Sequence, residues 1–330
     1  MSTRMELPMN SVVFSLPGST GFRLIHQLDR GISAKAASEG GSFAFRSFSG
    51  SNGVAYIHGD VSKEVDARYL GVSLLERSAG NSPDKASYMK QVGLAKAQAS
   101  AMGGKIVLSR PIEISSSLRP GESLVALREQ FPDAFVYLLH TARDGTWMGA
   151  TPEVLIEQQH GVYATMALAG TKWDDDLFEQ KEFDEQMLVT RDIMERLSDT
   201  VIEVSDIREH PYGGLRHLRT DIRWEDERDA FTFAEKLHPT PAIAGYPRKE
   251  ALAFIHANEG YDRGLYTGYL GWSDPNESSH LFVNLRCLQL FRDHAVFYAG
   301  GGVNADSVAE KEWEETERKK DSVVNVLVHE

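Results

Sequence analysis

The stretch Leu281-Phe-Val-Asn-Leu-Arg-Cys-Leu-Gln-Leu290 has the composition of a buried β-strand. Side chains alternate between the two faces of a strand, so Phe282 and Arg286 are expected on one face and Cys287 on the other. A cation in so apolar a run needs a partner, because an unpaired buried charge is costly. The partner of Arg286 is either a structural carboxylate or a ligand carboxylate held by two N–H groups.

Further strands and helices are predicted on both sides of this stretch. Neither a repeat of fixed period nor a long Pro/Ser-rich linker divides the chain. The mixture of many strands with helices between them favours one α+β domain over residues 1–330. Within it, residues 1–80 add variable strands and residues 86–325 carry the motifs. Strands are expected at residues 11–16, 43–48, 54–58, 105–110, 134–141, 265–272, 280–290 and 295–299, and helices at 85–102, 123–131, 177–205, 230–237, 248–257 and 308–328.

Charge and cysteine content exclude several classes of function. The 330 residues carry a formal net charge of −13 without a long cluster of Lys and Arg, whereas nucleic-acid binding needs clustered positive charge. The single cysteine excludes an intramolecular disulfide and suits a reducing compartment. Since no apolar run reaches about 18 residues and no signal segment stands out, we expect a cytoplasmic protein without a membrane span.

Two Glu-x-x-Glu pairs stand out in predicted helices. Glu182 and Glu185 share one helical face, as do Glu312 and Glu315. Like charges at this spacing repel, and a Mg²⁺ ion between the two pairs would relieve the repulsion. The alternative is a solvated acidic face, which is common in so acidic a chain.

Basic residues near these pairs also have two interpretations each. Lys319 shares the face of Glu315, where it forms an ordinary salt bridge or presents a cation to an anionic substrate. The glycines of residues 298–303 form a simple turn or let backbone N–H groups approach an anion. Lys105 and Glu153 are surface charges or, in a closed pocket, a base and an acid.

Taken in chain order, these segments resemble the chorismate-utilising enzymes, the family of isochorismate synthase, salicylate synthase, anthranilate synthase component I and aminodeoxychorismate synthase. The resemblance spans residues 86–325. The matching segments are KIVLSR (105–110), TPEVLI (151–156), LAGT (168–171), KEFDEQMLV (181–189), RHLRTDI (216–222), LHPTPAIAGYP (237–247), YDRGLYTGYLGW (261–272), VNLRCLQL (283–290), AGGGVNADS (299–307) and EWEETERK (312–319).

The resemblance implies the anthranilate synthase component I fold, a β-sandwich-like core surrounded by helices, and a Mg²⁺ cofactor. Glu185 and Glu315 would ligate the metal, with Glu182 and Glu312 supporting it through water. The implied chorismate site contains Gly170, Thr171, His217, Ala242, Ile243, Arg286, Gly300, Gly301 and Lys319.

Two positions indicate the reaction within the family. Members that use ammonia for anthranilate resemble one another in having glutamine where Lys105 stands, and aminodeoxychorismate synthases have a lysine where Ala169 stands. Water is therefore the expected nucleophile, deprotonated by Lys105 for attack at ring C2, while Glu153 protonates the departing C4 hydroxyl. This chain departs from its relatives at Lys172, where an arginine-rich segment is common, and at Thr267, where glycine is frequent.

The resemblance favours isochorismate synthase, an isomerase, with menaquinone synthesis as the expected pathway and siderophore synthesis as the alternative. A salicylate synthase, which also eliminates pyruvate, and a non-catalytic chorismate-binding paralogue are the competing interpretations. We expect a monomer without a glutaminase subunit.

Overall fold

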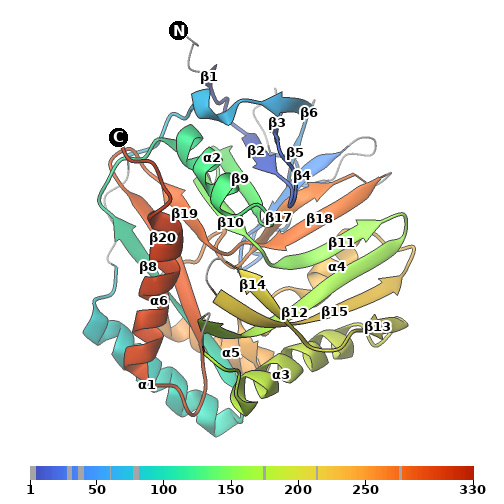
Figure 1. Ribbon diagram of the computed structural model, residues 1–330, viewed down its shortest axis with the longest axis vertical. Coiled ribbons are helices and arrows are strands. Elements are labelled where there is room, and N and C mark those ends of the chain that lie inside the picture. The colour runs from blue at the N-terminus through green and yellow to red at the C-terminus, as the bar shows by residue number, and fades with distance from the viewer. Residues whose placement is uncertain are drawn as a thin grey trace.

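The computed structural model describes the chain in eight segments, and nine strands form the first of its two large antiparallel sheets (Figure 1). The described residues are 5–27, 32–35, 41–59, 61–76, 82–173, 176–212, 215–274 and 277–330. The first sheet has the order β16 (Gly245–Tyr246), β8 (Lys105–Ile114), β20 (Ala295–Val303), β19 (Cys287–Leu290), β10 (Gly145–Thr151), β9 (Phe135–Thr141), β2 (Ser11–Ser15), β3 (Phe22–His26) and β6 (Val61–Val65).

The second sheet packs face to face against the first. Its order is β13 (Ile202–Val204), β15 (Leu215–Glu225), β12 (Val162–Trp173), β11 (Val154–Gln159), β18 (Ser278–Val283), β17 (Tyr269–Ser273), β4 (Ser42–Arg46) and β5 (Ala55–His58), with β14 (Arg208–Tyr212) also paired to β15. A short parallel pair joins β1 (Met5–Glu6) to β7 (Leu70–Gly71), next to the 3-10 helix Ala67–Tyr69. Because the N-terminal strands extend both large sheets, the arrangement supports the proposal of one domain.

Aromatic and aliphatic side chains fill the space between the sheets. Phe14 and Phe135 of the first sheet contact Phe43 of the second at ring-centroid distances of 5.7–6.4 Å. Phe135 also stacks on Phe282 at 4.6 Å. The sole cysteine, Cys287, is fully buried in the same layer. Interdigitating inner faces of this kind are typical of a β-sandwich.

The chain crosses from one sheet to the other within the stretch predicted as a single strand. That prediction is wrong, because β18 ends at Val283 in the second sheet and β19 begins at Cys287 in the first. Arg286 lies in the connection with a left-handed backbone (φ +49°), and so does not share a strand face with Phe282. Alternation could not reveal the break, because the apolar pattern continues through both strands.

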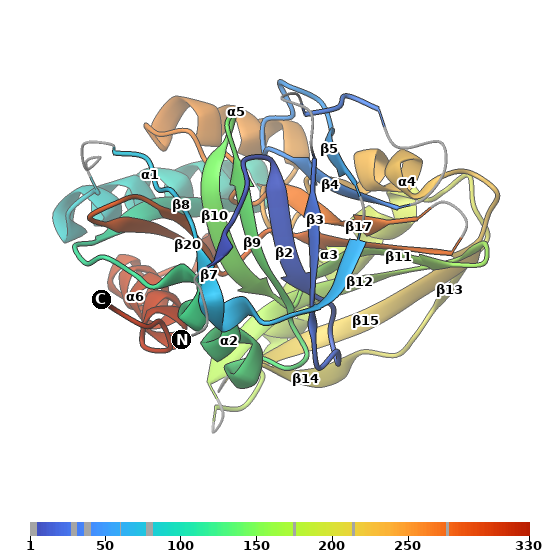
Figure 2. The same cartoon turned by 90° about the horizontal axis from the view of Figure 1, so that it is seen from above.

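Six helices are described, α1 (Lys85–Met102), α2 (Pro120–Gln130), α3 (Gln180–Arg196), α4 (Ala230–Leu237), α5 (Arg248–Asn258) and α6 (Ala309–Val324). The helix expected over residues 177–205 is shorter, because it ends at Arg196 and Ile202–Val204 pairs with β15. In Figures 1 and 2, α1 and α6 lie at one end of the molecule and α4 at the other. Within the described segments, none of the helices combines the length and apolarity needed to span a bilayer.

A buried ion pair ties the first sheet to the segment after α5. Arg263 and Glu259 have side chains that are each 2% exposed, with Arg263 Nη2 2.5 Å from Glu259 Oε1. The same carboxylate oxygen accepts hydrogen bonds from Ser109 N and Oγ on β8, both at 2.8 Å. Arg263 Nη2 also donates to Val107 O at 2.8 Å. The pair thus has the additional hydrogen bonds that a buried salt bridge requires.

Glu259→Ala should lower the free energy of unfolding by about 3–5 kcal/mol, because it leaves the Arg263 guanidinium buried without its partner. Urea unfolding followed by far-UV circular dichroism measures the change. Glu76 forms an exposed pair with Arg292, so Glu76→Ala is the matched control and should cost less than about 1 kcal/mol. Equal losses in the two variants would contradict the role given to burial.

Candidate active site

One cavity of about 180 Å³ gathers almost all of the predicted site residues. This volume exceeds what one ion or water molecule needs, so the cavity has room for a small organic ligand. The walls come from β8 and β20 of the first sheet, β12 and β15 of the second, and helices α3 and α6. The predicted residues that line the cavity are Lys105, Glu153, Gly170, Glu182, Glu185, His217, Ala242, Ile243, Arg286, Gly300, Gly301, Glu312, Glu315 and Lys319.

Lys105 is the first residue of β8 and is 5% exposed. Helix α1 stops just before it at Gly103, which adopts the left-handed conformation. A Cβ on Gly104 would lie 1.8 Å from Tyr246 O, so glycine permits the close pairing of β8 with β16. Lys105 Nζ donates to Glu185 Oε1 at 2.7 Å. The ammonium therefore points toward the acidic side of the cavity.

Glu153 lies in the connection between β10 and β11 and is 7% exposed. Burial raises its pKa to about 7, although the charges of Lys105 and Lys319 act in the opposite direction. Its backbone carbonyl accepts a hydrogen bond from Val283 N at 2.9 Å, which fixes the connection against the end of β18. A carboxyl group with this pKa can hold a proton near neutral pH, as a general acid must.

Glu182 and Glu185 project from the first turns of α3. Burial alone would raise the pKa of Glu185, but Lys105, Lys181 and Lys319 together lower it. Glu182 instead serves the fold, because its carboxylate accepts from Glu179 N at 2.8 Å in a capping box. Its other oxygen lies 3.4 Å from Lys172 Nζ. The two glutamates therefore differ in how available they are to a ligand.

Glu312 and Glu315 face the glycine-rich end of β20 from α6. Burial and repulsion by Glu315 raise the pKa of Glu312 to about 7. Glu312 Oε2 is buried without a hydrogen-bond partner among the described residues. A Cβ on Gly301 would lie 3.0 Å from this oxygen and 3.4 Å from Glu315 Oε1, so glycine leaves the space in front of both carboxylates open.

Lys319 makes the salt bridge that its spacing allows and also lines the cavity. Its Nζ lies 2.5 Å from Glu315 Oε1 and donates to Gly300 O at 2.7 Å. The two interpretations of Lys319 are thus compatible, since the ammonium is paired and still faces the cavity.

Arg286 supplies a further cation on the cavity wall, besides Lys105 and Lys319. It is 9% exposed, and its Nη1 donates to Ser322 Oγ on α6 at 3.0 Å. Ala242 and Ile243 line the cavity from the segment between α4 and β16. Buried Arg286 and partly buried Lys319 beside apolar surface suit a small ligand that carries carboxylates.

A bulge in β12 brings α3 close to the sheet. The register shifts between Ala169 and Thr171, and Gly170 adopts φ +63°. A Cβ on Gly170 would lie 2.9 Å from Glu182 Cβ, so only glycine allows this approach. Thr171 pairs with His217 in the ladder, but its side chain falls outside the described part of the chain.

His217 is nearly buried and stays neutral. Burial, together with the positive charges of Arg286 and Lys319, lowers its pKa to about 3. At neutral pH the imidazole can therefore donate or accept a hydrogen bond at the cavity wall without adding charge.

Several cavity residues were not singled out from the sequence. Lys181, Tyr266 and Tyr298 also line the wall. Each lies in or next to a segment quoted above, so the segment was identified while the individual side chain was not. The rings of Tyr266 and Tyr298 stack with their centroids 5.5 Å apart. From the sequence alone, an aromatic residue in a β-rich chain is expected in the hydrophobic core and not in a ligand site.

The acidic residues fit a divalent cation only after their lysine partners move. Among the described residues, no three His, Cys, Asp or Glu side chains already form a metal-binding group. Lys105 and Lys319 are instead paired with Glu185 and Glu315. The unpartnered oxygen of Glu312 and the open space at Gly301 are what a hard cation with carboxylate and water ligands would use.

Comparison with known proteins gives the family. A model of the family described as "chorismate binding enzyme" matches residues 64–328. Isochorismate synthase EntC of Escherichia coli K12 is 29% identical over 280 residues, which are 79% of this chain and 71% of that protein.

Solved structures show the same fold. A putative 2,3-dihydroxybenzoate-specific isochorismate synthase, DhbC, from Bacillus anthracis has a TM-score of 0.80 at 23% identity, covering 97% of this chain and 96% of that one. Anthranilate synthase component I from Streptococcus pneumoniae has a TM-score of 0.71 at 17% identity, covering 96% and 92%. The expected α+β fold of anthranilate synthase component I is confirmed, and the chain belongs to the family of chorismate-binding enzymes.

Proposed function

We propose that this protein is an isochorismate synthase, an isomerase that interconverts chorismate and isochorismate with the help of Mg²⁺. The proposal depends chiefly on one observation, that buried Lys105 at the start of β8 and buried Glu153 between β10 and β11 line the same cavity. The similarity to isochorismate synthase EntC supports the same reaction.

The two residues have complementary roles in the proposed reaction. Lys105 would take a proton from water as the water attacks ring C2, and Glu153 would give a proton to the departing C4 hydroxyl. The pKa of Glu153, about 7, keeps the acid form available near neutral pH. Arg286 and Lys319 would hold the carboxylates of chorismate, while neutral His217 offers a hydrogen bond without attracting an additional anion.

Glu185 and Glu315 would hold Mg²⁺, with Glu312 beside them. When bound, the ion would hold the ring carboxylate and neutralise developing negative charge. Because Glu185 Oε1 is also the partner of Lys105, metal ligation would leave the Lys105 amine free to face the substrate. The capping role of Glu182 favours Glu312 over Glu182 as the supporting carboxylate.

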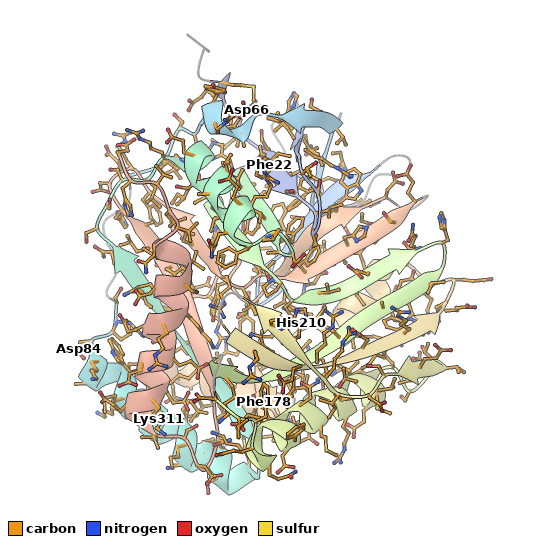
Figure 3. The ribbon with its side chains drawn as sticks, viewed as in Figure 1. Phe22, Asp66, Asp84, Phe178, His210 and Lys311 are labelled. Atoms are coloured by element: carbon orange, nitrogen blue, oxygen red, sulfur yellow. The ribbon has the colours of Figure 1, made fainter. Side chains whose placement is uncertain are left out.

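Purified protein incubated with chorismate and Mg²⁺ should form isochorismate alone, in a reversible mixture with chorismate. Chromatography resolves isochorismate, salicylate, pyruvate and, with ammonium added, anthranilate. Lys105→Ala should lower kcat/KM by about 10²–10⁴-fold, the range for general-base catalysis. Lys311 is exposed on α6 (Figure 3), so Lys311→Ala should keep full activity. Pyruvate at a comparable rate would indicate a salicylate synthase, and binding without turnover a non-catalytic paralogue.

The kcat/KM for isochorismate formation should fall as the pH rises through about 7, because Glu153 then loses the proton that the reaction needs. Glu153→Gln should be slow and should lack this alkaline limb. Glu312 also has a pKa of about 7, so Glu312→Gln at saturating Mg²⁺ is the control and should retain the limb. A limb that persists in Glu153→Gln would rule out Glu153 as the acid.

Mg²⁺ should stabilise the protein in the absence of chorismate. At about 100 times its Kd, a ligand specific for the folded state raises the free energy of unfolding by about 2.7 kcal/mol. Thermal unfolding with and without Mg²⁺ should show this increase in wild type and lose it in Glu185→Gln and Glu315→Gln. Glu314 is exposed on the same helix, and Glu314→Gln should respond like wild type. A uniform response in all four proteins would place the ion elsewhere.

We propose menaquinone synthesis, with siderophore synthesis as the alternative, as the pathway that uses isochorismate. A cytoplasmic location and a monomeric state are also predictions.

A further inference from the structure

Thr267 holds an unfavourable backbone conformation on the cavity wall. Its φ is +58°, in the left-handed region, and it is 1% exposed. Side chains branched at Cβ rarely adopt this region, and such conformations persist only where the surroundings hold them. The strand expected over residues 265–272 begins only at Tyr269, because the chain turns through Thr267 first.

Two segments distant in the sequence hold the backbone of Thr267, and residues of its own turn hold the hydroxyl. Thr267 N donates to Asn284 O at 2.8 Å, and Thr267 O accepts from His238 Nε2 at 2.8 Å. Thr267 Oγ1 accepts from Arg263 Nη1 at 3.3 Å and donates to Tyr266 O at 2.6 Å. Both polar backbone groups of this residue are therefore satisfied by partners outside its own turn.

The tautomer of His238 follows from its second partner. His238 Nδ1 lies 2.8 Å from Arg46 Nη1, and a guanidinium group can only donate. Nδ1 is therefore the acceptor, and the proton of the neutral ring sits on Nε2, where it is donated to Thr267 O. Glu235 holds Arg46 in place, with Arg46 Nε 3.1 Å from Glu235 Oε1.

Burial and neighbouring cations keep this imidazole neutral. His238 is 1% exposed. Burial, followed by the charges of Arg46 and Arg248, lowers its pKa to about 3, against the opposite effect of the Thr267 carbonyl. The donor at Nε2 is consequently the same throughout the neutral pH range.

Arg263 links Thr267 to the strand that carries the proposed catalytic residue Lys105. Arg263, which contacts the Thr267 hydroxyl, also donates to Ile243 O at 2.9 Å and to Val107 O at 2.8 Å. Val107 lies two residues after Lys105 on β8. The position of Thr267 is thus coupled through Arg263 to the strand that carries Lys105 and to the cavity wall at Ile243.

We propose that His238 is a positioning residue, which holds the carbonyl of strained Thr267 through Nε2–H and thereby keeps the Tyr266–Thr267 wall in place for reaction. His238 is absent from the cavity lining that the described residues form, so it acts through Thr267. This inference rests on the proposed isochorismate synthase activity.

A double-mutant cycle tests the proposal. His238→Ala should lower kcat by about 10²-fold, with KM changing much less, because misplacement of a supporting group by about 1 Å can cost this much. Glycine adopts the left-handed region without strain, so in the Thr267→Gly background the additional loss from His238→Ala should be less than about 3-fold. His238→Gln should recover most of kcat, because its amide can both donate to Thr267 O and accept from Arg46.

His140 is the matched control, being a buried histidine that contacts Thr146 and lies outside the cavity lining. His140→Ala should lower the unfolding temperature and leave kcat unchanged. If His238→Ala does not fold, His238→Leu, which fills the space of the ring but cannot donate to Thr267 O, replaces it in the two backgrounds. Additive losses from His238→Ala and Thr267→Gly, or no recovery in His238→Gln, would overturn the proposal.

Failure of the proposed function would be recognised separately. If the wild type binds chorismate but forms no isochorismate, the same variants can be compared by the increase in unfolding temperature that chorismate produces. Coupling between His238 and Thr267 in that measurement would support the positioning role, and additivity would refute it.

Discussion

The passage of the chain between the two sheets at Asn284–Arg286 is the constraint on which the site depends. Asn284 Oδ1 accepts from the Tyr137 hydroxyl at 2.7 Å, and its Nδ2 donates to Leu265 O at 2.9 Å. One buried amide thereby connects the first sheet to the turn before β17. Because Arg286, two residues later, has a left-handed conformation, its guanidinium is directed by backbone geometry and not by strand alternation.

Buried charge is the second organising feature of the site. Lys105 pairs with Glu185 of α3 at 2.7 Å, and Lys319 pairs with Glu315 one turn earlier on α6 at 2.5 Å. Ions removed from water are tolerated when they are paired and hydrogen-bonded. The same pairing brings cations and carboxylates together in the lining of one small cavity, where interactions with a charged ligand are stronger than in water. The side chains that we propose for ligand recognition are thus the ones that are paired in the ligand-free protein.

Much of the fold could be predicted from local patterns. The helices at residues 85–102 and 230–237 have the predicted bounds, because Asp84 and Gly103 cap the first helix and Asp229 caps the second. The break at Asn284 and the early end of α3 at Arg196 could not be predicted, since both depend on contacts with distant strands. A one-dimensional pattern shows that a segment is buried without showing which sheet buries it.

In the candidate site, too, some features could be predicted from the sequence and others depend on distant contacts. Glutamates three residues apart on one helix can be read from the sequence, and α3 and α6 do present them to one cavity. The capping bond of Glu182 and the contact between His238 and Thr267 depend on three-dimensional neighbours. For these residues the sequence supplies the chemical group, and packing decides its use.

The burial of Cys287 gives the molecule an internal probe. It is the single thiol of the chain and lies between the sheets, directly after Arg286. A reagent that modifies thiols reaches it only when the layers separate. The rate of modification of the unaltered protein therefore measures how often the sandwich opens beside the substrate cavity, and slower modification in the presence of a ligand would report binding without an assay of turnover.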